Sequence, residues 1–184
     1  MTASALLIDD EPLARKGLKE YINDTSFMEL AGEFDSPLQA TDLISSGTVQ
    51  LLFLDIQMPR ITGLDYFKSL QQPPPVIFTT AYPEYALEGF EVNALDYLVK
   101  PISFERFLKA AHKAKEYYEL KERNRAEGNS GDYFFIKTDS KLVKIFYDEI
   151  LYVEALQNYV TIHTATRKYM TYLTFRAVEE YLPA

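Results

Sequence analysis

Residues 51–55 read Leu-Leu-Phe-Leu-Asp, four consecutive apolar residues followed by an aspartate. An apolar run without polar alternation is typical of a strand that is covered on both faces, as in a parallel sheet. Segments with helical periodicity separate this run from four other short apolar runs, at residues 5–8, 29–34, 76–78 and 97–99. Strands that alternate with helices predict an α/β unit with a five-stranded, doubly wound parallel sheet.

Apolar residues recur at helical spacing directly after the first predicted strand. The residues of this face are Leu13, Gly17, Leu18, Tyr21 and Ile22. Their spacing predicts an amphipathic helix. A second face of this kind, which begins with Phe104 and Phe107, predicts a later helix, and Ser103 just before it is suited to cap its first turn.

Acidic and polar side chains follow the ends of these strands. Asp9 and Asp10 follow the first strand, Asp55 the third, Thr80 the fourth and Lys100 the fifth. The carboxyl ends of parallel strands border one crevice, where sheets of this kind place their chemistry. Alone, each residue is explained as a helix cap, a strand end or a surface charge. Together, in this order, they predict one joint site.

The chemistry of that site follows from its residue types. Three carboxylates packed together are unfavourable unless a cation lies between them, and oxygen ligands without His or Cys suit Mg²⁺ with several waters retained. Asp55 can then act as a nucleophile that accepts phosphate as an acyl phosphate. The metal and Lys100 would neutralise the phosphoryl oxygens, and Thr80 could donate a hydrogen bond to one of them.

The sequence resembles the response-regulator receiver family over residues 4–121. The resemblance is carried by residues 7–12 (Leu-Ile-Asp-Asp-Glu-Pro), 54–59 (Leu-Asp-Ile-Gln-Met-Pro) with Gly63, 78–81 (Phe-Thr-Thr-Ala) and 96–101 (Asp-Tyr-Leu-Val-Lys-Pro). It implies the flavodoxin-like fold and a phosphoryl group received on Asp55 from a sensor histidine kinase. The Mg²⁺ ligands implied are Asp10, Asp55 and the backbone carbonyl of Gln57, with Asp9 assisting through water.

The same resemblance implies how the phosphate is sensed. Thr80 would move towards the phosphoryl group, Tyr97 would swing inward behind it, and Lys100 would pair with the phosphate. A cis peptide bond is implied between Lys100 and Pro101. The fourth helix, expected to begin near residues 82–84, would form with the fifth strand and fifth helix a face that turns a monomer into a homodimer. The candidate residues of that face are Phe90, Glu91, Arg106 and Lys109.

The pattern changes after the receiver-like part, residues 1–122. Residues 123–132 are polar with two glycines and are interpreted as a linker. Residues 133–184 follow a period near two, with strands expected at 133–137, 142–146, 150–154, 159–163 and 169–173 and a final helix over 175–182.

This second part is similar to the amino-terminal half of a LytTR-type DNA-binding domain. The similarity is carried by residues 135–141, 150–155 and 158–163. It implies promoter binding and transcription regulation, with candidate DNA contacts at Asn158, Tyr159, Arg167 and Lys168. Because family members are commonly about twice as long in this region, either the chain is a fragment or this domain no longer binds DNA.

Charge and composition limit the possible functions. The net charge of the 184 residues is −8; residues 1–122 hold 11 Lys and Arg against 19 Asp and Glu, whereas residues 133–184 hold 6 of each. A neutral second part weakens the electrostatic case for DNA, because affinity depends largely on phosphate neutralisation. The chain has no cysteine, no signal-peptide pattern and no membrane-length apolar run, which predicts a cytoplasmic protein.

Two other functions remain open at this point. An aspartyl-phosphate phosphatase would need an acid two residues after the nucleophile, and Gln57 at that position cannot exchange a proton. Catalysis beyond the protein's own phosphorylation and dephosphorylation is therefore not expected. The alternative is a phosphorylation-dependent protein-interaction adaptor whose second part does not bind DNA.

Overall fold

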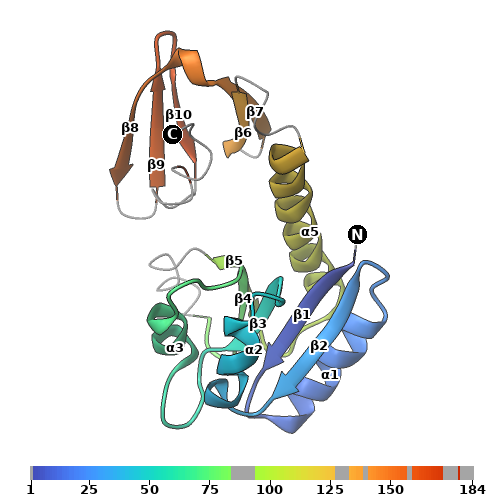
Figure 1. Cartoon of the computed structure of the whole chain (residues 1–184). Coiled ribbons are helices and arrows are strands. Elements are labelled where there is room, and N and C mark those ends of the chain that lie inside the picture. The colour runs from blue at the N-terminus through green and yellow to red at the C-terminus, as the bar shows by residue number, and fades with distance from the viewer. Residues whose placement is uncertain are drawn as a thin grey trace. The chain divides into compact units, whose positions relative to one another are not determined.

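The computed structural model covers the 184-residue chain in two compact units, Met1–Lys115 and Glu116–Ala184. Figure 1 shows the order of their helices and strands along the chain. The residues described are 2–83, 94–126, 133–138, 141–156, 159–171 and 178. Among them, no helix is long and apolar enough to cross a membrane.

The first unit is built on a five-stranded parallel sheet with the order β2-β1-β3-β4-β5, which confirms the predicted fold class. The central strand β3 is the Leu-Leu-Phe-Leu-Asp segment, and all five of its residues are buried. The strands are β1 (Ala3–Ile8), β2 (Met28–Phe34), β3 (Leu51–Asp55), β4 (Val76–Thr80) and β5 (Ala94–Val99).

Helices cover both faces of this sheet because successive residues of a strand point to opposite sides. Leu52 and Leu54 pack in one core cluster with residues of α2 and α3, while Leu51 and Phe53 pack in a second cluster with residues of α1 and α5. The helices are α1 (Pro12–Asn23), η1 (Pro37–Ala40), α2 (Thr41–Ser45), α3 (Gly63–Ser69) and α5 (Phe104–Ala126).

Two helices differ in detail from the sequence prediction. In α1, Leu18 and Ile22 are buried, but Leu13 in the first turn is 78% exposed, so the apolar face begins later than predicted. Helix α5 continues to Ala126, so residues 123–126 of the predicted linker are helical. Residue 84 of the predicted start of the fourth helix, and the residues Phe90 and Glu91, lie in the segment 84–93, outside the described residues.

The second unit is mostly β, as predicted. Its two antiparallel sheets pair β6 with β7 and place β9 between β8 and β10. Phe134, Ile145, Ile162 and Tyr169 lie in their common core cluster, which also contains Val178. The elements are β6 (Tyr133–Thr138), β7 (Lys141–Phe146), η3 (Tyr147–Glu149), β8 (Ile150–Leu156), β9 (Tyr159–Thr164) and β10 (Lys168–Thr171).

The predicted final helix, residues 175–182, can be compared with the structure at one position. Val178 is helical and almost fully buried, with 1% of its surface exposed. The other residues of that segment lie outside the described part of the chain, as do the last residues of the strand predicted over 169–173.

Candidate functional site

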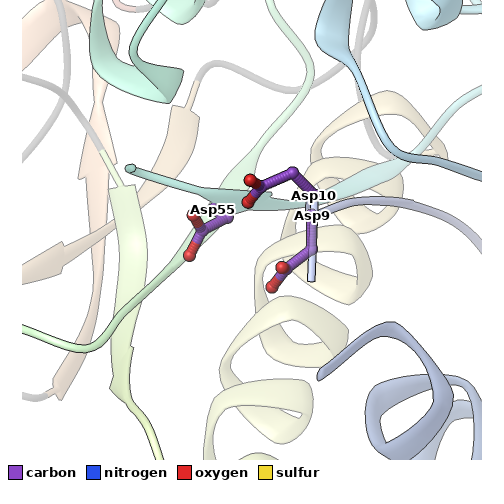
Figure 2. A group of neighbouring side chains, drawn as sticks. All are labelled: Asp9, Asp10 and Asp55. Atoms are coloured by element: carbon purple, nitrogen blue, oxygen red, sulfur yellow. The ribbon is translucent and has the colours of Figure 1, made fainter. Parts of the chain in front are cut away.

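Three carboxylates gather at the carboxyl ends of β1 and β3. Asp9 and Asp10 directly follow β1, and Asp55 is the last residue of β3. Because these two strands are hydrogen-bonded neighbours, a ligand oxygen from each carboxylate lies within 4.8 Å of the others. Figure 2 shows the three side chains side by side. Asp9 and Asp55 are buried, whereas Asp10 reaches solvent.

Lys100, just after β5, supplies the positive charge of the site. Its Nζ lies 2.8 Å from Asp9 Oδ2, 3.0 Å from Asp55 Oδ1 and 3.5 Å from Glu11 Oε2. The backbone holds this lysine in place, since its amide donates to the carbonyl of Thr80 at 2.7 Å. The peptide bond that follows, Lys100–Pro101, is cis, as the sequence resemblance implied.

The electrostatics leave Asp55 with a surplus of nearby negative charge. Burial raises the pKa of Asp55 and the charge of Asp9 raises it further, while Lys100 opposes both, so that the pKa rises from 3.8 to about 6. Burial alone would lower the pKa of Lys100, but the hydrogen bond to Asp9 and the charges of both carboxylates raise it above its ordinary value. Lys100 therefore stays charged, and a further cation would stabilise the ionised Asp55.

The donor set fits a hard divalent cation. Carboxylate oxygens from three residues are close together, and the buried Asp9 Oδ2 lies 2.8 Å from the Lys100 ammonium. Such ligands suit Mg²⁺. Gln57 is exposed two residues beyond Asp55, and together with Asp10 it lines an open groove of about 640 Å³.

The two threonines at the end of β4 have different partners. Thr80 Oγ1 accepts a hydrogen bond from the amide of Tyr82 at 3.1 Å, so it is engaged away from the carboxylates. Thr79 Oγ1 instead donates to Asp55 Oδ1 at 3.4 Å. The sequence pattern indicated Thr80 alone, and the contact of Thr79 was not predicted. The only feature of the sequence that could have indicated the Thr79 contact is the second hydroxyl residue at the end of this strand.

Tyr97 lies on β5 beside β4. Its ring stacks on Phe78, with centroids 5.5 Å apart and an interplanar angle of 19°, and the residue is only partly buried. Phe78 in turn meets Phe67 of α3 edge-on at 5.6 Å. Tyr97 therefore belongs to a group of three contacting aromatic rings that includes Phe78, the residue just before the threonines of β4.

The loop between β3 and α3 passes very close to the backbone of Asp55. The Gly63 amide donates to the carbonyl of Ile56 at 2.9 Å. A Cβ atom at position 63 would lie 2.1 Å from the carbonyl oxygen of Asp55, far inside van der Waals contact. Thr62 caps α3 by accepting a hydrogen bond from the Asp65 amide at 3.1 Å. Glycine at position 63 therefore lets this cap sit against the Asp55 backbone.

The candidate DNA contacts do not form one cluster among the described residues. Tyr159 opens β9 and is 39% exposed, whereas Lys168 pairs with His163 near the other end of that strand. Arg167 lies in the turn between β9 and β10, where its Nε donates to the hydroxyl of Tyr169. Asn158 lies outside the described residues.

Comparisons with known proteins match both units. The model of the response regulator receiver domain matches residues 5–112, and the model of the LytTr DNA-binding domain matches residues 140–184. The sensory transduction protein LytT of Bacillus anthracis is 32% identical over 187 residues, which cover 97% of this chain and 76% of that protein. The transcriptional regulatory protein BtsR of Escherichia coli K12 is 32% identical over 184 residues, covering 97% and 77%.

Solved structures agree for the first unit. The receiver domain of AraT, a response regulator from Geobacillus stearothermophilus, superimposes with a TM-score of 0.59 at 32% identity, covering 66% of this chain and 99% of that one. The response regulatory domain of mrkE from Klebsiella pneumoniae gives 0.57 at 32% identity, covering 63% and 98%. With the geometry at Asp55, these matches establish that the chain belongs to the response regulators that join a receiver domain to a LytTR DNA-binding domain.

Proposed function

We propose that a sensor histidine kinase transfers a phosphoryl group to Asp55, and that the phosphorylated receiver controls DNA binding by the LytTR unit. The observation that carries this proposal is the buried Asp55 carboxylate, with the Lys100 ammonium 3.0 Å away and two further carboxylates beside it. The domain matches support a regulator of transcription rather than an enzyme that acts on a small substrate. The homologues named as transcriptional regulators point the same way.

The proposed transfer uses the groups at the strand ends. A carboxylate oxygen of Asp55 attacks the phosphorus, a P–O bond forms, and the bond to the donor's histidine nitrogen breaks. Lys100 neutralises charge on the phosphoryl oxygens. Mg²⁺, held by Asp10, Asp55 and the Gln57 carbonyl with Asp9 through water, would neutralise the remaining charge.

The direct test is the mass of the intact protein after incubation with acetyl phosphate and Mg²⁺. Wild-type protein should gain one phosphoryl group that hydroxylamine removes, since acyl phosphates react with this nucleophile. Asp55→Asn should gain none, while Asp24→Asn, which changes an exposed aspartate at the end of α1, should behave as wild type. Equal uptake by wild type and Asp55→Asn would place the acceptor elsewhere.

The proposed output step begins at Thr80. If its hydroxyl leaves the Tyr82 amide for the phosphoryl oxygens, the ring of Tyr97 can move inward, and the surface of β5 and α5 changes. We infer that this change shifts a monomer towards a homodimer. Sedimentation of the chain with and without beryllofluoride, a phosphate mimic, tests this step, and a chain that stays monomeric with the mimic bound would refute it.

The DNA step has a separate readout. The proposed receiver spans residues 1–122 and the LytTR unit residues 133–184, with 123–132 between them. A gel-shift series with promoter DNA should show tighter binding by the beryllofluoride-loaded protein than by the Asp55→Asn protein treated in the same way. Specific phosphate-dependent binding of a protein partner, with no DNA binding in either state, would instead favour an adaptor.

A further inference from the structure

Two charged side chains engage the backbone of Tyr97 at the outer edge of β5. In the sheet order β2-β1-β3-β4-β5, β5 is an edge strand. The Lys100 amide donates to Thr80 on the β4 side. Because backbone groups of a strand alternate in direction from one residue to the next, the amide and carbonyl of Tyr97 face the open side.

Both of these backbone groups have a side-chain partner. The Tyr97 amide donates to Asp96 Oδ1 at 2.9 Å, and Arg106 Nη2 donates to the Tyr97 carbonyl at 2.7 Å. The same guanidinium grips the Asp96 carboxylate with two bonds, from Nη1 to Oδ2 at 2.8 Å and from Nη2 to Oδ1 at 2.6 Å. We call this closed set of contacts the Asp96–Arg106 clamp.

Neighbouring residues make further contacts with both residues of the clamp. The Asp96 side chain is only 9% exposed, and Lys113 Nζ lies 2.9 Å from its Oδ2. The Arg106 amide donates to Ser103 Oγ at 3.3 Å, which fixes the first turn of α5. Burial would raise the pKa of Asp96, but hydrogen bonds from Arg106 and Lys113 outweigh it and hold the pKa below its ordinary value. The carboxylate and guanidinium both stay charged, as a two-bonded pair requires.

The position of the clamp gives it a role in the receiver. On β5, the ring of Tyr97 stacks on Phe78. Three residues later, just after the end of this strand, Lys100 carries the ammonium that contacts Asp55. The clamp ties the backbone of Tyr97 to helix α5. A ring held by a fixed peptide can change its side-chain rotamer without moving the strand that aims Lys100 at the phosphorylation site.

We propose that Asp96 and Arg106 are positioning residues for the phosphorylation switch. They fix the Tyr97 peptide to α5, so that a change at Thr80 is converted into movement of the Tyr97 ring rather than of β5. This inference rests on the proposed phosphorylation of Asp55. In this proposal both residues act through the Tyr97 backbone and not by contact with the phosphoryl group.

The test removes the two-bonded guanidinium of Arg106 but keeps a positive charge at that position. Arg106→Lys retains a cation but cannot form two parallel bonds. The matched control is Lys19→Gln, which removes a cation on α1 that pairs with Glu33 at 3.2 Å and is 45% exposed. The full chain, labelled with ring-¹³C-tyrosine, is titrated with beryllofluoride in Mg²⁺, and the ring resonance of Tyr97 is followed.

We expect Arg106→Lys to lose about half or more of the Tyr97 ring shift that beryllofluoride induces, because one ammonium cannot hold both the carboxylate and the carbonyl. Its Mg²⁺ affinity should stay within about twofold of wild type, since the metal ligands are untouched. Lys19→Gln should match wild type in both measurements. Asp96→Asn should repeat the effect, and the double variant should be no worse than either single one.

Other outcomes would overturn the proposal. A Tyr97 response in Arg106→Lys equal to that of wild type removes the positioning role. Loss of the response together with Mg²⁺ affinity indicates general damage to the fold, and it also argues against the clamp. If Arg106→Lys does not fold, Asp96→Asn is decisive by the same two readouts. Failure of the proposed function is separate, because wild-type protein would then take up no phosphate on Asp55.

Discussion

The burial of Asp55 beside Asp9 predicts that ionisation of Asp55 lowers the stability of the metal-free fold. In the folded chain the pKa of Asp55 rises from 3.8 to about 6, because of burial first and the charge of Asp9 second. A raised carboxyl pKa stabilises the fold below the unfolded-state pKa, and this contribution is lost as pH rises through about 6. At neutral pH the ionised Asp55 therefore destabilises the metal-free fold.

Replacing this carboxylate should consequently stabilise the protein. At about 1.36 kcal/mol per pKa unit, the shift sets an upper limit of about 3 kcal/mol on the gain in unfolding free energy for Asp55→Asn at pH 7.5 in EDTA. An asparagine cannot reproduce the ion pair with Lys100, so we expect about 1 to 3 kcal/mol. Near pH 4 the gain should shrink towards zero, because wild-type Asp55 is then protonated in the folded state.

Urea unfolding followed by far-ultraviolet circular dichroism measures this gain, with the variant and wild type compared at each pH so that other titrating groups cancel. Saturating Mg²⁺ should narrow or reverse the difference, since the cation binds the ionised wild-type site more tightly. A variant that is less stable than wild type in EDTA at neutral pH, or a difference that does not change with pH, would refute the electrostatic reasoning.

Two further predictions concern the same site, and a third is a matched glycine substitution in α1. Asp10→Asn should weaken Mg²⁺ binding by about tenfold or more, measured by calorimetry, because one charged ligand is lost; unchanged affinity would move the metal away from Asp10. Gly63→Ala should lower the unfolding free energy by about 2 kcal/mol or more in urea titrations, because its Cβ would lie 2.1 Å from the Asp55 carbonyl. Gly17→Ala, which meets nothing within 4 Å in the middle of α1, should instead stabilise by about 0.5 to 1 kcal/mol, and equal effects at the two glycines would contradict the packing argument.

The sequence was sufficient to predict the sheet and the residues at its carboxyl edge. Strand ends and the residues after them are local features, and parallel topology brings them together wherever helices intervene. For this reason Asp9, Asp55 and Lys100 could be grouped from the sequence alone, and their contacts at 2.8 and 3.0 Å agree with that grouping.

Features that depend on where a helix sits could not be predicted in this way. The contact between Asp96 and Arg106 joins a strand to a helix ten residues later, and no pattern in the sequence distinguishes Arg106 from the lysines around it. Leu13 matches the helical spacing of α1, but it lies in the first turn and its side chain is 78% exposed. Residues 123–126 belong to the predicted linker, yet they extend α5, and arginine and alanine are good helix formers.

The clamp also has a consequence for the behaviour of the protein at high concentration. An unprotected sheet edge can pair with the edge of another molecule and start aggregation. The opposite edge strand, β2, carries Glu29 and Glu33 exposed to solvent, and like charges on it repel a second copy of the same strand. On β5 the Tyr97 peptide is already engaged by Asp96 and Arg106, so it has no hydrogen-bonding groups to offer there. Loss of the clamp should therefore make the protein less soluble during expression and storage.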